Sequence, residues 1–170
     1  MDDFSKTILK ELLPVEKELP VPPKAKRKRR EDALDHLSSP ILLERAAYLR
    51  KLAKHGDGSA GEVLKEYPQH AIHLLVRSRN GGAELHENFA DLFFVLEGRA
   101  ALVTGGTVAD AKIIAPGEVR GSSVEGGIHQ ELRAGDVAHV PAGLPHQMLV
   151  SGDNVVTCLV VKIQQEPQKP

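Results

Sequence analysis

The chain has 170 residues, a net charge of −1, 4% aromatic residues and no tryptophan. This length suits one compact domain of about 100 to 150 residues with an appendage, and the near-neutral charge gives the chain as a whole no electrostatic attraction to nucleic acid or membranes. No apolar stretch approaches the ~20 residues of a membrane span. The start of the chain is acidic, unlike a signal peptide, and the single cysteine, Cys158, excludes an intramolecular disulfide. We therefore expect a cytoplasmic protein with no membrane partner, in which Cys158 is a small buried strand residue.

Residues 1–35 are predicted to form a helix followed by a linker rich in proline and basic residues. Apolar residues recur at helical spacing over 4–13, and the helix ends before Pro14. In the run 24–30, six of the seven residues are cationic, which is typical either of a contact with nucleic acid or of a solvated linker. We favour the linker and do not expect a nucleic-acid partner, because no aromatic residue interleaves the charges.

Residues 36–58 are predicted to contain a second helix, over about 40–54. Ser38 or Ser39 is its candidate cap, and Gly56 follows its last turn. One face of this helix is apolar, so we expect it to pack against the rest of the molecule or against a partner subunit. The apolar face comprises Ile41, Leu42, Ala46, Leu49, Leu52 and Ala53.

Residues 59–163 have the pattern of an all-β domain, with short β-branched runs between glycine-rich turns, and 164–170 are predicted to be a disordered tail. Strands at this spacing are typical of a sandwich closed into a barrel. They are predicted near 62–66, 71–77, 83–86, 92–96, 99–104, 129–132, 137–140, 146–150 and 155–162.

The segment 105–127 is longer than an ordinary hairpin requires. Long glycine-rich insertions in compact folds are often functional lids, and in that case Lys112 and Arg120 would meet an anionic substrate at the mouth of the barrel. The alternative is a solvated loop with no role in binding.

Acidic and imidazole side chains converge in the segment 83–98. Glu84 and His86 are two residues apart on a predicted strand, so both point to the same face. Asp91 begins the next apolar strand, where a bend brings its carboxylate back towards the same point. Glu87 would replace one of them if the register were shifted by one residue.

The segment 135–146 predicts a strand, a rigid turn and a presented imidazole. Pro141 ends the strand because it cannot continue a central ladder, Gly143 relieves the backbone restriction at the turn, and Pro145 stiffens the exit towards His146. A histidine on such a corner is held in few rotamers, as a metal ligand should be. The alternative is a surface hairpin in which the histidine has no function.

These two segments resemble the two motifs of the cupin superfamily. The later segment fits the second cupin motif, G-x5-P-x-G-x2-H, without a gap from Gly135 to His146. The earlier segment resembles the first motif, in which H-x-H is followed after three or four residues by E and after six more by G. Counting back from Gly98 aligns Asp91 with the glutamate, His86 with the second histidine and Glu84 with the first. The resemblance covers roughly residues 60–163 and implies a double-stranded β-helix, the jelly-roll barrel.

The resemblance also implies a divalent metal in the barrel. Cupins of the common type hold their metal with three histidines and one glutamate, and this chain offers Glu84, His86, Asp91 and His146 at the matching positions. Two imidazoles and two carboxylates suit Fe, Mn or Zn alike. Because Asp is one methylene shorter than Glu, the alternative role of Asp91 is to orient a histidine beside the metal. A metal-free barrel with a polar pocket is the other alternative.

Two further histidines lie on predicted strands near the motifs. His139 is in phase with Val137, and we predict that it projects into the barrel as a catalytic base beside the metal. His73 shares a strand face with Leu75 and Arg77. Its simplest interpretation is a histidine at the barrel rim, and we include it with Arg120 as a candidate substrate-binding residue.

Together these features predict a metal-dependent enzyme that acts on a small organic acid, sugar acid or carbonyl compound, by oxygenase, isomerase or lyase chemistry. The alternative is a non-catalytic regulatory module that binds a small molecule and has a basic N-terminal arm. Family analogy also implies a homodimer.

Overall fold

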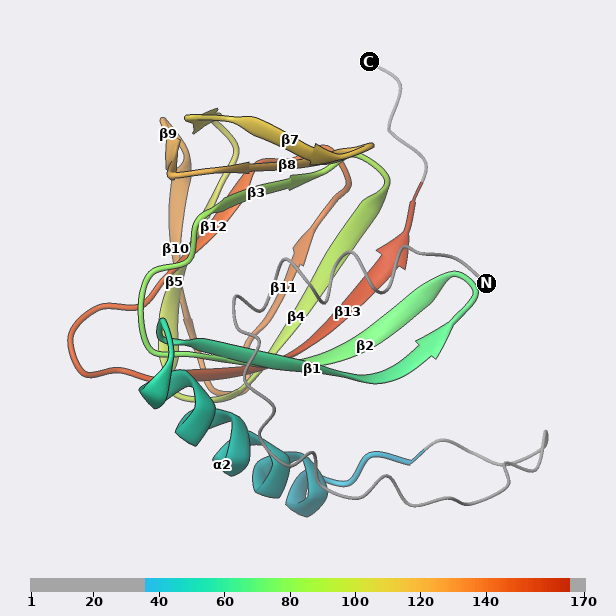
Figure 1. Ribbon diagram of the computed structural model, residues 1–170, viewed down its shortest axis with the longest axis vertical. Coiled ribbons are helices and arrows are strands. Elements are labelled where there is room, and N and C mark those ends of the chain that lie inside the picture. The colour runs from blue at the N-terminus through green and yellow to red at the C-terminus, as the bar shows by residue number, and fades with distance from the viewer. Residues whose placement is uncertain (1–35, 166–170) are drawn as a thin grey trace.

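The computed structural model describes residues 36–165. The predicted helix over 4–13, the basic run 24–30 and residues 166–170 of the predicted tail lie outside the described residues. In the described part of the chain one helix precedes a series of strands, and the strands curl into a barrel (Figure 1). No helix in this part has the length and apolar character needed to cross a membrane.

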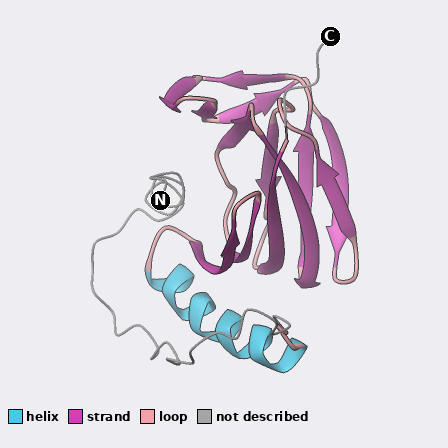
Figure 2. Cartoon of the chain, turned by 90° about the vertical axis from the view of Figure 1, so that its right-hand side faces the viewer, coloured by secondary structure: helices cyan, strands magenta, loops and turns pink. Residues whose placement is uncertain are grey.

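The helix, α2 (Ser39–His55), packs against the outside of the barrel (Figure 2). Ser38 is its N-cap residue, and at the other end the Gly56 N–H donates to the Leu52 carbonyl oxygen at 3.0 Å. The helix predicted over 40–54 is therefore confirmed with each end displaced by one residue. Most of its predicted apolar face is buried, in particular Leu42, Ala46, Leu49 and Ala53.

Thirteen strands follow within residues 59–164, and they include all nine predicted strands. Their bounds are β1 (Ser59–Tyr67), β2 (His70–Arg77), β3 (Ala83–His86), β4 (Phe89–Glu97), β5 (Arg99–Thr104), β6 (Thr107–Ala109), β7 (Lys112–Ala115), β8 (Glu118–Gly121), β9 (Ser123–Glu125), β10 (Ile128–Arg133), β11 (Val137–Val140), β12 (His146–Leu149) and β13 (Val156–Gln164).

The strands form two facing antiparallel sheets and a small ribbon. One sheet has the order β1-β2-β13-β4-β11 and the other has the order β10-β5-β12-β3-β8-β7, while β6 pairs with β9. The chain passes between the two sheets several times, for example at the turn between β3 and β4, so both sheets contain strands from distant parts of the sequence. This arrangement confirms the predicted all-β jelly-roll barrel.

Two hydrophobic clusters lie on the two sides of the five-stranded sheet. One fills the barrel between the sheets and includes Phe93, Met148 and Cys158. The other lies between α2 and the outer face of β1 and β2, where it takes in Leu74 and Val76. Because side chains alternate along a strand, this burial of Leu74 and Val76 under the helix turns the intervening side chains of β2 into the barrel.

The segment 105–127 is not the long loop or lid that its glycines suggested. It forms the four short strands β6 to β9, and β8 pairs with β3 along its whole length. Gly117, with φ of +78°, makes the turn that allows β8 to follow β7. Strands of three or four residues are stabilised by partners that are distant in sequence, and the glycine pattern alone does not indicate those partners.

Candidate metal centre

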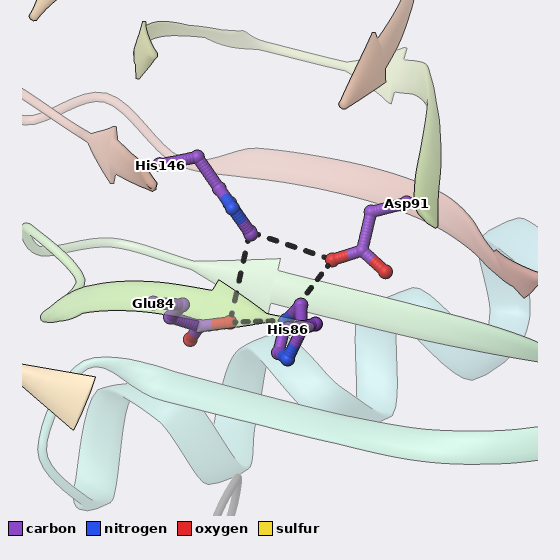
Figure 3. Close-up of side chains that lie close together, drawn as sticks. All are labelled: Glu84, His86, Asp91 and His146. Carbon is purple, nitrogen blue, oxygen red and sulfur yellow. Dashed lines mark ion pairs between the residues drawn. The ribbon is translucent and has the colours of Figure 1, made fainter. Parts of the chain in front are cut away.

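Four of the predicted site residues come together in the barrel, and they come from both sheets (Figure 3). Glu84 and His86 lie on β3, and His146 begins the neighbouring strand β12, with its Cα paired to that of Glu84. Asp91 lies on β4, in the opposite sheet. One potential ligand atom from each of the four lies within 4.8 Å of all the others, so a single ion could contact the whole set.

Both imidazoles direct Nε2 at the same two carboxylates. The Asp91 Oδ2 atom lies 3.4 Å from the Nε2 atoms of both His86 and His146. The Glu84 Oε2 atom lies 3.4 Å from Nε2 of His86 and 3.9 Å from Nε2 of His146. The two rings are tilted by 56° with their centroids 5.3 Å apart, so neither stacks on the other and both ring edges remain directed at the centre.

The other ring nitrogen of each histidine is held by an acceptor. Nδ1 of His86 lies 2.6 Å from Oε2 of Glu118, and Nδ1 of His146 lies 3.2 Å from the carbonyl oxygen of Leu144. A carbonyl oxygen accepts but does not donate, and a carboxylate also accepts, so each Nδ1 carries the hydrogen. When either imidazole is neutral, its lone pair is therefore at Nε2, which is the arrangement found when a histidine binds a metal.

Both Nε2 atoms are buried and have no hydrogen-bond partner among the described residues. Leaving a buried polar atom unpaired is costly, by roughly 1 to 3 kcal/mol for each atom. A divalent ion at the centre would satisfy both nitrogens and would be neutralised by the two carboxylates. The cluster could therefore hold a metal ion, and its members are the ligands implied by the sequence.

Strand β8 supplies two charged residues that border this site. In the pairing of β3 with β8, Glu118 lies opposite His86 and Arg120 lies opposite Glu84. The Glu118 side chain is only 4% exposed. Nη1 of Arg120 lies 3.3 Å from Oε2 of Glu118, and its Nη2 lies 3.9 Å from Oε2 of Glu84. Arg120 therefore partly neutralises the carboxylates of the site.

A buried ammonium group supports Asp91. Lys162 lies on β13 with its Cα paired to that of Asp91, and its Nζ donates to Oδ1 of Asp91 at 2.8 Å. Oδ2 of the same carboxylate is left to face the two histidines. Burial acts to raise the pKa of Asp91, but Lys162 and the two imidazoles outweigh it and hold that pKa well below its usual value. Asp91 is therefore an anion with one oxygen directed at the centre.

The carboxylates also change the titration of His86. Burial and the Lys162 charge act to lower the pKa of His86, but the carboxylates of Asp91, Glu118 and Glu84 outweigh them and raise it to about 10. Burial acts to raise the pKa of Glu84, and the neighbouring cations, chiefly His86 and Arg120, lower it below its ordinary value. In the absence of a metal, the centre therefore retains a proton on His86 at neutral pH.

His139 does not face the barrel. It lies on β11 with its side chain exposed, while Ala138 and Val140 point inward towards the hydrophobic cluster. The prediction that it projects into the barrel beside the metal is therefore wrong, because the strand has the opposite phase to the one assumed: Val137, its in-phase neighbour, is 56% exposed. Glu87, the substitute ligand considered for a shifted register, is also exposed.

His73 lies in the barrel wall rather than at an open rim. It is 8% exposed and, with Lys162 and three members of the cluster (Glu84, Asp91 and His146), it lines a cavity of about 60 Å³. Burial and the nearby Lys162 charge lower the pKa of His73 to about 4, so the ring is neutral near pH 7. Arg120 is not among the residues that line this cavity, and Lys112, the other cation expected to meet substrate, is exposed on β7.

Two residues that border the centre were missed in the sequence. Lys162 had a usable indication, because it is in phase with Cys158 and Val160, which face the barrel interior on β13. Glu118 had none, because its strand is four residues long and its role depends on pairing with β3, more than thirty residues earlier.

Comparisons with known proteins agree with this fold. The family model described as Cupin matches residues 74–170, more than half of the chain. A crystal structure from Thermus thermophilus superposes with a TM-score of 0.51 at 18% identity, covering 72% of this chain and 94% of that one. No match was found among curated proteins.

Two solved structures with described activities are more distant. The polyketide cyclase RemF from Streptomyces resistomycificus has a TM-score of 0.47 at 18% identity, covering 65% of this chain and 68% of that one. A predicted oxalate decarboxylase from Thermotoga maritima has a TM-score of 0.47 at 15% identity, covering 62% of this chain and 80% of that one. At these identities the likenesses concern the fold alone. On the family match and the barrel fold together, the chain belongs to the cupin family.

Proposed function

We propose that this cupin is a metal-dependent enzyme that acts on a small organic acid, sugar acid or carbonyl compound. The observation that carries the proposal is the pair of buried, unpartnered Nε2 atoms of His86 and His146, both directed at the carboxylates of Glu84 and Asp91. Neither atom has a hydrogen-bond partner among the described residues, whereas buried polar groups normally have one.

In this proposal Glu84, His86, Asp91 and His146 hold one divalent ion, and Fe, Mn and Zn all suit the mixed nitrogen and oxygen set. When bound, the ion would act as a Lewis acid that polarises a substrate oxygen. Glu118 fixes the ring of His86, and Lys162 holds Asp91 by one oxygen so that the other faces the centre.

The cavity beside the centre supports a small substrate. It is bordered by apolar side chains, including Phe93, Met148 and Val160, and by polar side chains, including His73 and Arg77. A pocket of this kind positions a ligand with few directed contacts and excludes bulk water from the reacting atoms. Its volume of about 60 Å³ suits a molecule of a few carbon atoms better than a polymer.

Metal analysis of the gently purified protein is the first test. We expect close to one Fe, Mn or Zn per chain, and we expect His146→Ala to remove it because one of the two nitrogen donors is lost. His129→Ala is the matched control, since His129 is an exposed histidine on β10. If the wild-type protein neither retains nor takes up a divalent metal, the proposal is wrong.

Activity is tested on protein reconstituted with each metal in turn, on small hydroxy acids, keto acids and sugar acids, with and without oxygen. Turnover only in air indicates an oxygenase, whereas turnover under both conditions indicates an isomerase or lyase. A metal-loaded protein that binds such compounds without converting any would favour the regulatory module considered from the sequence.

A further inference from the structure

The cavity beside the metal centre has a second group of polar side chains, on β2. His73, Leu75 and Arg77 share the inner face of this strand and line the cavity, as do Glu84 and His146 of the metal centre. The opposite face of β2 is covered by α2. This polar group is therefore accessible to a small molecule from the cavity and not from the helix side.

The guanidinium group of Arg77 has no carboxylate partner among the described residues. Its Nε is buried and has no hydrogen-bond partner, and no ion pair joins Arg77 to a carboxylate within residues 36–165. The other cations near the barrel interior differ in this respect, because Lys162 is paired with Asp91 and Arg120 with Glu118. The Arg77 side chain is only partly buried, but its guanidinium faces a cavity without a carboxylate partner, so it is available to pair with the anionic group of a ligand.

The position of the guanidinium follows from its contact with Gly81. A Cβ placed on Gly81 would lie 2.9 Å from Nη1 of Arg77, so the guanidinium rests directly on this glycine. The Gly81 N–H donates to the carbonyl oxygen of Met148, two residues after His146. The guanidinium is therefore about two strand residues, or roughly 7 Å along the sheet, from the level of His146.

His73 adds a second unpartnered polar atom on the same face. Its Nε2 is buried and has no hydrogen-bond partner among the described residues. The cavity thus combines a planar cation with five donors, a neutral imidazole and the candidate metal centre, in walls that also include Lys162 and Gln147 beside several apolar side chains. A guanidinium pairs best with a planar carboxylate, through two parallel hydrogen bonds.

We propose that Arg77 is the carboxylate-binding residue of this cavity, and that the substrate is a small organic acid whose carboxylate pairs with the guanidinium while a second oxygen-bearing group reaches the metal centre. The carboxylate is held about one short carbon chain away from the ion. The contact of the second group with the metal centre rests on the proposed metal-dependent function, whereas the pairing of Arg77 with a carboxylate does not.

Calorimetric titration tests this with malonate and succinate as probes and with succinamide as the uncharged analogue of succinate. Each probe is titrated into the full chain, both metal-free and loaded with Zn²⁺. We expect both dicarboxylates to bind more tightly than succinamide and to bind more tightly still when zinc is present. We expect Arg77→Met to weaken dicarboxylate binding by at least about tenfold with zinc content unchanged.

Two further variants make the test specific. Gly81→Ala keeps the arginine but displaces its guanidinium, so it should weaken dicarboxylate binding by less than Arg77→Met does. Arg79→Met is the matched control, because Arg79 is an exposed arginine two residues away, and it should bind like the wild type. Arg77→Met should also melt no lower than the wild type, since it removes an uncompensated charge, whereas an arginine with only a structural role would lower the Tm when it is replaced.

The inference is overturned if the wild type binds neither dicarboxylate, if Arg77→Met binds them as tightly as the wild type, or if inorganic phosphate binds as tightly as succinate. If Arg77→Met does not fold, Gly81→Ala is compared with the wild type instead, and equally tight dicarboxylate binding by the two proteins overturns the inference. Arg77-dependent binding in a protein that takes up no metal would refute the proposed function and leave the carboxylate site standing. Zinc binding without any carboxylate binding would refute the carboxylate site and leave the proposed metal-dependent function standing.

Discussion

His86 and His146 present the same atom to the same point, but the chain supports them by different means. Nδ1 of His146 faces the carbonyl oxygen of Leu144, two residues earlier in the same turn. Nδ1 of His86 faces the carboxylate of Glu118, 32 residues away on a strand of the segment 105–127. One ligand is thus oriented by local backbone and the other by tertiary pairing, so the two should respond differently to changes in the protein and its solvent.

The largest expected difference concerns protons, because the carboxylates around His86 raise its pKa to about 10. A metal must displace this proton at any lower pH, so metal affinity should rise by about tenfold for each pH unit between 7 and 9 and become constant above about 10. Competition with a chromophoric chelator at several pH values measures this. An affinity that does not change over that range would contradict the retained proton on His86.

Loss of the His86 proton has the opposite effect on the stability of the metal-free protein, which decreases as the pH rises. A folded-state pKa raised above the unfolded value of about 6.5 contributes stability that is fully present below pH 6.5 and is lost as the pH rises through 10. The Tm of the metal-free protein should therefore fall as the pH rises from 7 to 10 while metal affinity increases.

The side-chain support of His86 can be removed by Glu118→Gln. We expect this change to weaken metal binding by about 10- to 100-fold, as is usual when the partner of a metal-bound histidine is lost. It should also flatten the pH dependence, because the Glu118 carboxylate is one cause of the raised pKa of His86. The matched control is Glu131→Gln, an exposed glutamate on β10, and equal metal affinities in the two variants would refute the role of Glu118.

No side-chain change removes the carbonyl that supports His146, so only the turn itself can be altered. Gly143 has φ of +80° and open space at its Cβ position, so Gly143→Ala introduces backbone strain without a clash. We expect it to lower the free energy of unfolding by about 1 kcal/mol and to change metal affinity less than Glu118→Gln does. Denaturant unfolding and chelator competition on the same sample test both, and a larger metal effect from Gly143→Ala would reverse the comparison.

The two histidines also differ in how much of their surroundings could be predicted. The motif from Gly135 to His146 contains both the ligand and its turn, so the sequence predicts the residue and its orientation together. For His86 the sequence predicts the ligand, because Glu84 and His86 share a strand face, but it does not predict Glu118. The pairing of β3 with β8 is long-range, and short glycine-flanked strands resemble loops.

His139 and Lys162 show the limit of strand periodicity. Alternation separates the two faces of a strand but does not say which face is inside, and a shift of one residue exchanges them. On β11, Val137 suggested one phase, whereas the structure buries Ala138 and Val140. On β13, the phase of Cys158 places Lys162 inside, yet only its Cα pairing with Asp91 shows that the buried ammonium has a carboxylate to neutralise it.

The sequence by itself determined the helix and the nine main strands, because each depends on spacing within a short segment, and its resemblance to the two cupin motifs implied the four residues of the candidate metal centre. Tertiary structure alone decided which cations have partners. Whether Arg120, Lys162 and Arg77 meet a carboxylate depends on pairing between strands that are far apart in sequence, and the energy of a buried charge is set by the few groups within a few ångströms of it.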